Sequence, residues 1–126
     1  MAIVAIGMDL AQIGRLEKVH ARHGERLLDR LFTAGERAYC DRRASRMASY
    51  AGRFAVKEAV MKALGTGWSS GVTWKDIEVT RNSGAAPELV LHGATARIAK
   101  ARGIAKIHIT ITHDGGVAAA VAIAES

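Results

Sequence analysis

The chain has 126 residues, a length typical of a single domain, and its formal net charge of +6 favours an acidic partner: a phosphorylated ligand, nucleic acid, an anionic membrane or an acidic protein. Hydrophobic residues make up 49% of the chain and charged residues 24%, a balance that excludes a disordered protein. The lone Cys40 excludes an intrachain disulfide framework and a multi-cysteine zinc site.

The N-terminal run from Ala2 to Met8 is short and almost wholly apolar, which predicts a buried strand. Asp9 would follow at its carboxyl end, where α/β sheets place ligand sites. Asp9 could equally be the N-cap of the next helix. The run is too short to cross a membrane and has no basic flank, so we expect a cytoplasmic protein with no membrane partner.

Residues 11–31 have the pattern of one or two helices, with Gly24 as the predicted break. One face is mainly apolar, and the opposite face is basic (Arg15, Lys18, Arg22 and Arg26). A charged face can be merely solvated, but a face of one sign favours docking to an acidic surface. Thr33 to Glu36 then has capping-box spacing, which predicts the start of a short helix.

The stretch from Arg53 to Leu64 contains no Gly or Pro and predicts a helix that ends at Gly65. Its sides are apolar nearly all round, so the helix should be buried, and Glu58 interrupts one apolar stripe. Glu58 could simply pair with Lys62 four residues on. Alternatively, two lysines beside a carboxylate and a Gly-Thr-Gly loop could form a site for a metal and a phosphate.

The rest of the chain alternates short elements. We expect a loop at 68–72, a strand at 77–79, a turn at 82–87, a returning strand at 88–92 and a helix at 95–102. A hairpin follows, with strands at 107–112 and 117–124. The last strand has no polar face, so both of its faces need cover. No repeat or linker interrupts the chain, which predicts one domain over residues 1–126.

Three stretches resemble the small holo-acyl-carrier-protein synthases, bacterial phosphopantetheinyl transferases of the short type. Gly7 to Arg15 is similar to the family's G-x-D-x-x-x-x-x-R opening, and Phe54 to Gly67 matches F-x-x-K-E-A-x-x-K-A-x-G-T-G at every fixed position. Ile109 to His113 resembles the S-x-S-H strand and turn, with threonines in place of the serines. The turn at 84–87 lacks the basic residue common before its Pro.

The resemblance implies an α+β fold, with a small antiparallel sheet packed on one long central helix. It also implies a homotrimer whose sites are shared between subunits. The implied reaction moves 4'-phosphopantetheine from coenzyme A to a serine of apo-acyl carrier protein and releases adenosine 3',5'-bisphosphate. Such a transfer depends on positioning and charge neutralisation.

By this resemblance Asp9 and Glu58 would hold Mg²⁺, and Lys62 would neutralise the leaving phosphate. Glu58, or a water on the metal, would accept the serine proton. Further residues are implied for the two substrates. The coenzyme A cleft would be lined by Arg53, Lys57, Lys62, Gly65, Thr66 and Gly67, with Thr112 and His113 at the adenosine-phosphate end. Arg15, and Arg22 by helical spacing, would dock the acidic carrier protein.

Two other classes fit part of the sequence. A basic nucleic-acid-binding domain would explain the charge, but aromatic residues for base stacking make up only 5% of the chain. A nucleotide-binding regulatory module would explain the lysines and the Gly-Thr-Gly, but the G-x-x-x-x-G-K-[ST] phosphate loop is absent. We therefore expect no nucleic-acid partner.

Overall fold

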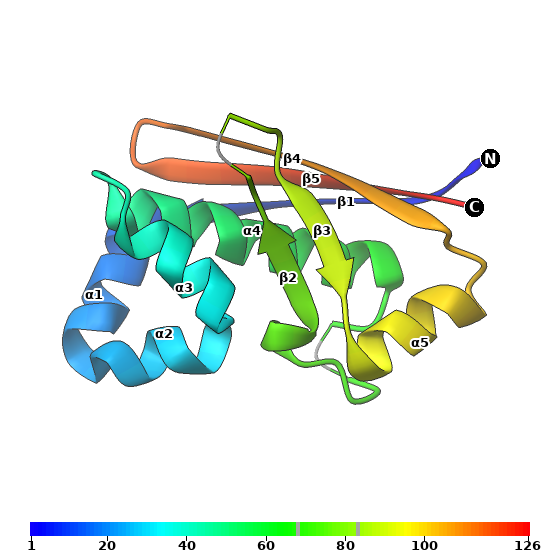
Figure 1. Cartoon of the computed structure of the whole chain (residues 1–126), viewed down its shortest axis with the longest axis horizontal. Helices are drawn as coiled ribbons and strands as arrows, with labels where there is room; N and C mark the ends of the chain where they lie inside the picture. The colour runs from blue at the N-terminus through cyan, green and yellow to red at the C-terminus, as the bar shows by residue number, and fades with distance from the viewer. Residues whose placement is uncertain (68, 83) are drawn as a thin grey trace.

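A three-stranded antiparallel sheet lies along one side of the long helix α4 (Arg46–Leu64) in the computed structural model, which describes residues 1–67, 69–82 and 84–126 (Figure 1). The strands are β1 (Ile3–Gln12), β4 (Lys106–Asp114) and β5 (Val117–Glu125), in the order β1-β5-β4. This architecture confirms the predicted α+β fold with a small sheet on a central helix.

Smaller elements pack around α4. Helices α1 (Ile13–His23), α2 (Glu25–Leu31) and α3 (Ala34–Asp41) gather at one end. A second antiparallel pair, β2 (Ile77–Thr80) and β3 (Glu88–Leu91), packs nearer the other end with α5 (Gly93–Ala101). The predicted break at Gly24 is confirmed, and so is the capping box of α3. The predicted loop 68–72 and turn 82–87 each include one residue outside the described part, Trp68 and Ser83.

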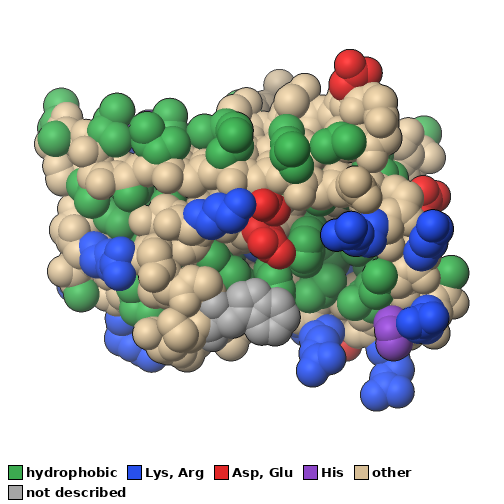
Figure 2. Space-filling model, turned by 180° about the vertical axis from the view of Figure 1, so that it is seen from behind, with side chains coloured by type: hydrophobic (Ala, Val, Ile, Leu, Met, Phe, Trp, Pro, Cys, Tyr) green, Lys and Arg blue, Asp and Glu red, His purple; other side chains and the backbone are tan. Residues whose placement is uncertain are grey.

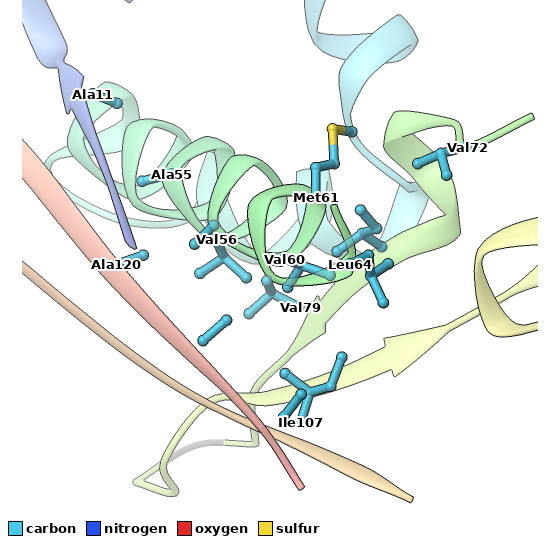
Figure 3. Close-up of a cluster of buried hydrophobic side chains, with 14 of the residues drawn as sticks. Ala11, Ala55, Val56, Val60, Met61, Leu64, Val72, Val79, Ile107 and Ala120 are labelled. Carbon is cyan, nitrogen blue, oxygen red and sulfur yellow. The ribbon is translucent and has the colours of Figure 1, made fainter. Parts of the chain in front are cut away.

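Helix α4 is buried on nearly all sides, as its sequence predicted. Its alanines face the sheet, where Ala118, Ala120, Ala122 and Ala124 of β5 are buried, so the small side chains let strand and helix lie close together. On another side Val56 and Val60 pack with Val79 of β2 (Figure 3). The helix ends at Gly65, whose φ of 72° is the left-handed conformation that glycine adopts without strain.

Strand β1 lies against α4 because Gly7 has no side chain. A Cβ at Gly7 would come 1.9 Å from the carbonyl oxygen of Ala59, so any larger residue would push the strand off the helix. The strand then continues to Gln12, which is the N-cap of α1. Asp9 therefore lies within the strand, on the same face as Gly7. Its predicted place at the end of the strand is wrong, and so is the N-cap alternative.

The outer face of the sheet has no cover from this chain. In β1 the side chains of Val4, Ile6, Met8 and Leu10 are between 45% and 63% exposed, so the prediction of a buried first strand is wrong for a single chain. Met8 and Leu10 pair with Val121 and Ala119 of β5, which continue the apolar face. A row of hydrophobic side chains is visible along this side of the molecule (Figure 2). Within the described residues, no helix is long and apolar enough to span a membrane.

Candidate active site

Asp9, Glu58 and Lys62 come together where β1 crosses α4. The Lys62 ammonium donates hydrogen bonds to Asp9 Oδ1 at 2.8 Å and to the carbonyl oxygen of Met8 at 3.1 Å. The salt bridge with Asp9 raises the pKa of Lys62. Glu58 and Lys62 lie one turn apart on α4, and the close approach at Gly7 brings Asp9 to them. Strand β1 and helix α4, which are far apart in the sequence, thus supply one charged cluster.

Glu58 has a carboxylate neighbour and an apolar setting. Burial raises the pKa of Glu58, the Asp9 carboxylate raises it further, and Lys62 opposes both effects. Among the described residues, Lys62 makes its salt bridge with Asp9 and makes none with Glu58. The interpretation of Glu58 as half of a simple helix-surface ion pair is therefore wrong.

The donor set fits a magnesium ion. Mg²⁺ is commonly held by one or two carboxylates together with substrate phosphate oxygens and water, so Asp9 and Glu58 suffice as protein ligands. The part of the chain that the structure describes holds no group of three His, Cys, Asp or Glu residues arranged for a metal. The negative charge of Asp9 makes ionisation of Glu58 less favourable. A divalent cation bound between two such carboxylates would offset their repulsion.

A groove of about 560 Å³ opens beside these carboxylates. Asp9 and Glu58 line it together with Arg15 of α1, and its wall contains the rings of Phe54 and Trp74. These two rings stack with centroids 5.1 Å apart. The sequence did not predict Trp74 in the site, because nothing in its local pattern brings it next to Phe54. Arg22 is exposed on α1 and does not line the groove.

A second pocket, of about 450 Å³, contains the residues expected at the adenosine-phosphate end. Thr112 and His113 line it together with Arg53, which the resemblance implied for the coenzyme A cleft. Arg43 and Arg81 add two further cations that the sequence did not predict for the site. The two pockets share no lining residue.

Arg53, which lines this second pocket, is largely buried. Its side chain is only 4% exposed, and its guanidinium lies 4.3 Å from the centre of the Tyr39 ring. Its Nε has no hydrogen-bond partner among the described residues. A buried donor without a partner costs free energy. Arg43, Arg53 and Arg81 all line this pocket, and such a concentration of cations suits a phosphate.

The Gly65-Thr66-Gly67 turn follows α4 directly, beside Lys62. Gly65 and Gly67 both have positive φ, and the backbone amide of Thr66 donates to the carbonyl oxygen of Met61 at 3.3 Å. Both glycines are exposed, which leaves room for a ligand to approach the backbone. The turn lines neither of the two pockets described above.

Lys57 does not lie where the family resemblance implied. Its side chain is wholly buried, and its ammonium donates to Glu36 Oε1 at 2.9 Å and to the carbonyl oxygens of Trp74 and Ile77. All three protons of the ammonium are used, so none remains for a substrate phosphate. The expectation that Lys57 lines a cleft is corrected: packing of β2 and α3 against α4 encloses it.

Comparisons with known proteins identify the family of this chain. The family model described as the 4'-phosphopantetheinyl transferase superfamily matches residues 5–122. A holo-[acyl-carrier-protein] synthase of Anaeromyxobacter dehalogenans (strain 2CP-1 / ATCC BAA-258) is 48% identical over 126 residues, covering 98% of this chain and 96% of the relative. One from Methylobacterium sp. (strain 4-46) is 49% identical over 128 residues, with coverage of 98% and 95%.

Solved structures give the same result. The holo-[acyl-carrier-protein] synthase of Neisseria meningitidis superposes with a TM-score of 0.90 at 25% identity, over 99% of this chain and 100% of that one. The Helicobacter pylori enzyme in complex with coenzyme A superposes with a TM-score of 0.81 at 31% identity, over 95% and 99%. The chain belongs to the 4'-phosphopantetheinyl transferase superfamily and, within it, to the holo-[acyl-carrier-protein] synthase family.

Proposed function

We propose that this protein transfers 4'-phosphopantetheine from coenzyme A to a serine of apo-acyl carrier protein and releases adenosine 3',5'-bisphosphate. The observation that carries the proposal is the cluster of Asp9, Glu58 and Lys62 in a groove bordered by Arg15. Relatives named for the same activity, and the Helicobacter pylori structure with coenzyme A, support the choice of substrates.

Transfer of the phosphopantetheine group requires charge neutralisation and does not require a covalent intermediate on the protein. Asp9 and Glu58 would hold Mg²⁺, which supplies positive charge to the pyrophosphate oxygens. Lys62 stabilises the charge that grows on the leaving phosphate. Glu58, whose pKa is raised by burial and by Asp9, is suited to accept the proton of the attacking serine.

Coenzyme A would extend between two groups of residues. Its pyrophosphate binds at Lys62 and the Gly65-Thr66-Gly67 turn, and its adenosine-phosphate end binds the cations of the second pocket, with Arg53, Thr112 and His113. Because that pocket shares no lining residue with the groove of Glu58, we assign its role to a neighbouring subunit. Lys57 has no place in this cleft.

A homotrimer would provide such neighbours. The apolar outer face of the sheet, with Ile6, Met8 and Leu10 each more than 60% exposed, is the surface available for association. The acidic carrier protein would dock on the basic face of α1, through Arg15 and Arg22. We place the activity in the cytoplasm, in fatty acid biosynthesis.

The direct test is mass spectrometry of an apo-carrier protein after incubation with this protein, coenzyme A and Mg²⁺. The carrier should gain about 340 Da, the mass of the phosphopantetheine group. Asp9→Asn and Glu58→Gln should each abolish the gain, while the control Glu88→Gln, an exposed carboxylate of β3, should keep it. Absence of any gain, together with tight and salt-sensitive binding of oligonucleotides, would favour a nucleic-acid-binding domain instead.

A further inference from the structure

Lys57 is a buried cation that the proposed transfer reaction leaves without a role. Its side chain is fully enclosed, with the Phe32 ring 5.5 Å from Nζ. Burial lowers the pKa of Lys57, and the Glu36 carboxylate opposes that effect. Buried ion pairs can often be replaced by apolar side chains of similar volume without loss of stability, so stability alone does not explain a charge here.

The Lys57 ammonium ties three segments to α4. Its bonds to the carbonyl oxygens of Trp74 and Ile77 hold the short segment before β2 and the first residue of β2. Its bond to Glu36 reaches α3, and the other oxygen of Glu36 accepts from the backbone amide of Val79 in β2 at 2.9 Å. The Lys57 ammonium and the Glu36 carboxylate therefore use all of their polar atoms in hydrogen bonds that hold backbone segments in place.

The segment held in this way carries one wall of the candidate active site. Trp74 stacks on Phe54, and Phe54 lies one turn before Glu58 on α4. Both rings and the Glu58 carboxylate line the same groove. The depth of the Trp74 backbone relative to α4 therefore sets the width of the groove beside Glu58.

We propose that Lys57 is a positioning residue, which fixes the Trp74–Phe54 wall against Glu58 through the Trp74 and Ile77 carbonyl oxygens and the Glu36 carboxylate. The inference rests on the proposed function, because the wall matters for turnover only if the carrier serine meets coenzyme A in this groove. Lys57 touches neither substrate. Its effect is on the geometry in which the serine approaches.

The test variant is Glu36→Gln/Lys57→Met, which removes both charges so that neither is left buried alone. It is made in a Trp68→Phe background, which leaves Trp74 as the sole tryptophan.

Acrylamide quenching of Trp74 fluorescence should increase in this variant, because the ring is no longer held on Phe54. The kcat/KM for the carrier protein should fall at least about tenfold, as small misplacements in an active site do. The Kd for coenzyme A with Mg²⁺ should change by less than about twofold, since those contacts are elsewhere.

The stability control is Ile107→Ala in the same background, which removes a buried side chain of β4 outside the groove. It should lower thermal stability while keeping the quenching and the kinetics of its parent. A double variant with parental quenching and kinetics would overturn the inference and leave Lys57 a purely structural residue. Quenching needs no turnover, so a parent protein that transfers nothing would count against the proposed function and not against the placement of Trp74.

If the double variant does not fold, Phe54→Leu provides an independent test. It removes the stacking partner of Trp74 and leaves the Lys57–Glu36 ion pair intact. It should also lower kcat/KM for the carrier protein and increase quenching of Trp74. Parental values for both in Phe54→Leu would overturn the role given to the wall.

Discussion

At the scale of single residues, the sequence predicted the charged side chains of the proposed site but not their partners. Glu58 and Lys62 are four apart on a helix, so helix geometry alone suggested that they pair. The structure gives Lys62 to Asp9, which is 53 residues away, because Gly7 lets β1 lie directly on α4. Local periodicity contains no information about such a long-range approach. It showed only that Glu58 was out of place in an apolar stripe.

This arrangement predicts a pH-dependent effect of Glu58→Gln on stability. The pKa of Glu58 is raised above 4.5 in the folded protein, so its ionised form is less favourable there than in the unfolded chain. Above the folded pKa the wild type bears this cost, and below the ordinary value of 4.5 the cost disappears. Glu58→Gln should therefore be more stable than wild type at pH 7, and the difference should vanish as the pH falls below 4.5.

Thermal unfolding of both proteins at several pH values measures this difference, and Mg²⁺ provides a second comparison. At a free concentration ten times its Kd, Mg²⁺ should stabilise the wild type by about 1.4 kcal/mol. Glu58→Gln should gain much less, because one of two carboxylate ligands is lost. A Glu58→Gln protein that is less stable than wild type at pH 7 would contradict this role of Glu58 and make it a structural partner of Lys62.

At the scale of elements, helices were predicted well where their signals are local. The start of α3 at Thr33 and the end of α4 at Gly65 depend on residues a few positions apart, and both are found in the structure. The burial of Lys57 could not be predicted in the same way. Motif and helix periodicity do not say that β2 and α3 close over that side of α4, because the packing depends on contacts some 20 residues apart.

Helix α1 provides a prediction about docking. Arg15→Glu and Arg22→Glu should each raise the KM for the carrier protein by about tenfold, equivalent to about 1.4 kcal/mol, and leave the KM for coenzyme A nearly unchanged. Arg15 should have the larger effect because it also borders the groove of Glu58. Added salt should lower the wild-type rate, since exposed charges act mainly on encounter.

Steady-state kinetics with each substrate varied in turn measure these effects. The matched control is Lys100→Glu, a charge reversal at an exposed position on α5. It changes the net charge by the same amount, so a KM for the carrier protein that rises equally in this control would assign the effect to overall charge. An unchanged carrier KM in both arginine variants would leave the basic face of α1 merely solvated.

At the scale of the whole molecule, the apolar composition of β5 anticipated a sheet that needs cover on two faces. Helix α4 covers one face of the sheet. On the other face Ile6, Met8 and Leu10 of β1 are exposed beside Val121 of β5. The sequence could show that cover was missing but not where the missing surface lay, because the alternation of β1 was masked by its being apolar at nearly every position. The separation of the two pockets is likewise visible only in three dimensions.

This separation predicts that two defective proteins restore each other. If the site is shared, Glu58→Gln damages one half and His113→Ala damages the other, so mixed trimers contain sites in which both halves are intact. After random exchange of equal amounts, about a quarter of the sites in a cyclic trimer should combine two intact halves. Transfer activity should then exceed the mean of the two parents.

Mixing Glu58→Gln with Asp9→Asn is the matched control, because both lesions are in the same half and no intact site can form. Light scattering should report about three chain masses for every parent. A monomer, or no recovery despite demonstrated subunit exchange, would mean that each chain builds its whole site alone.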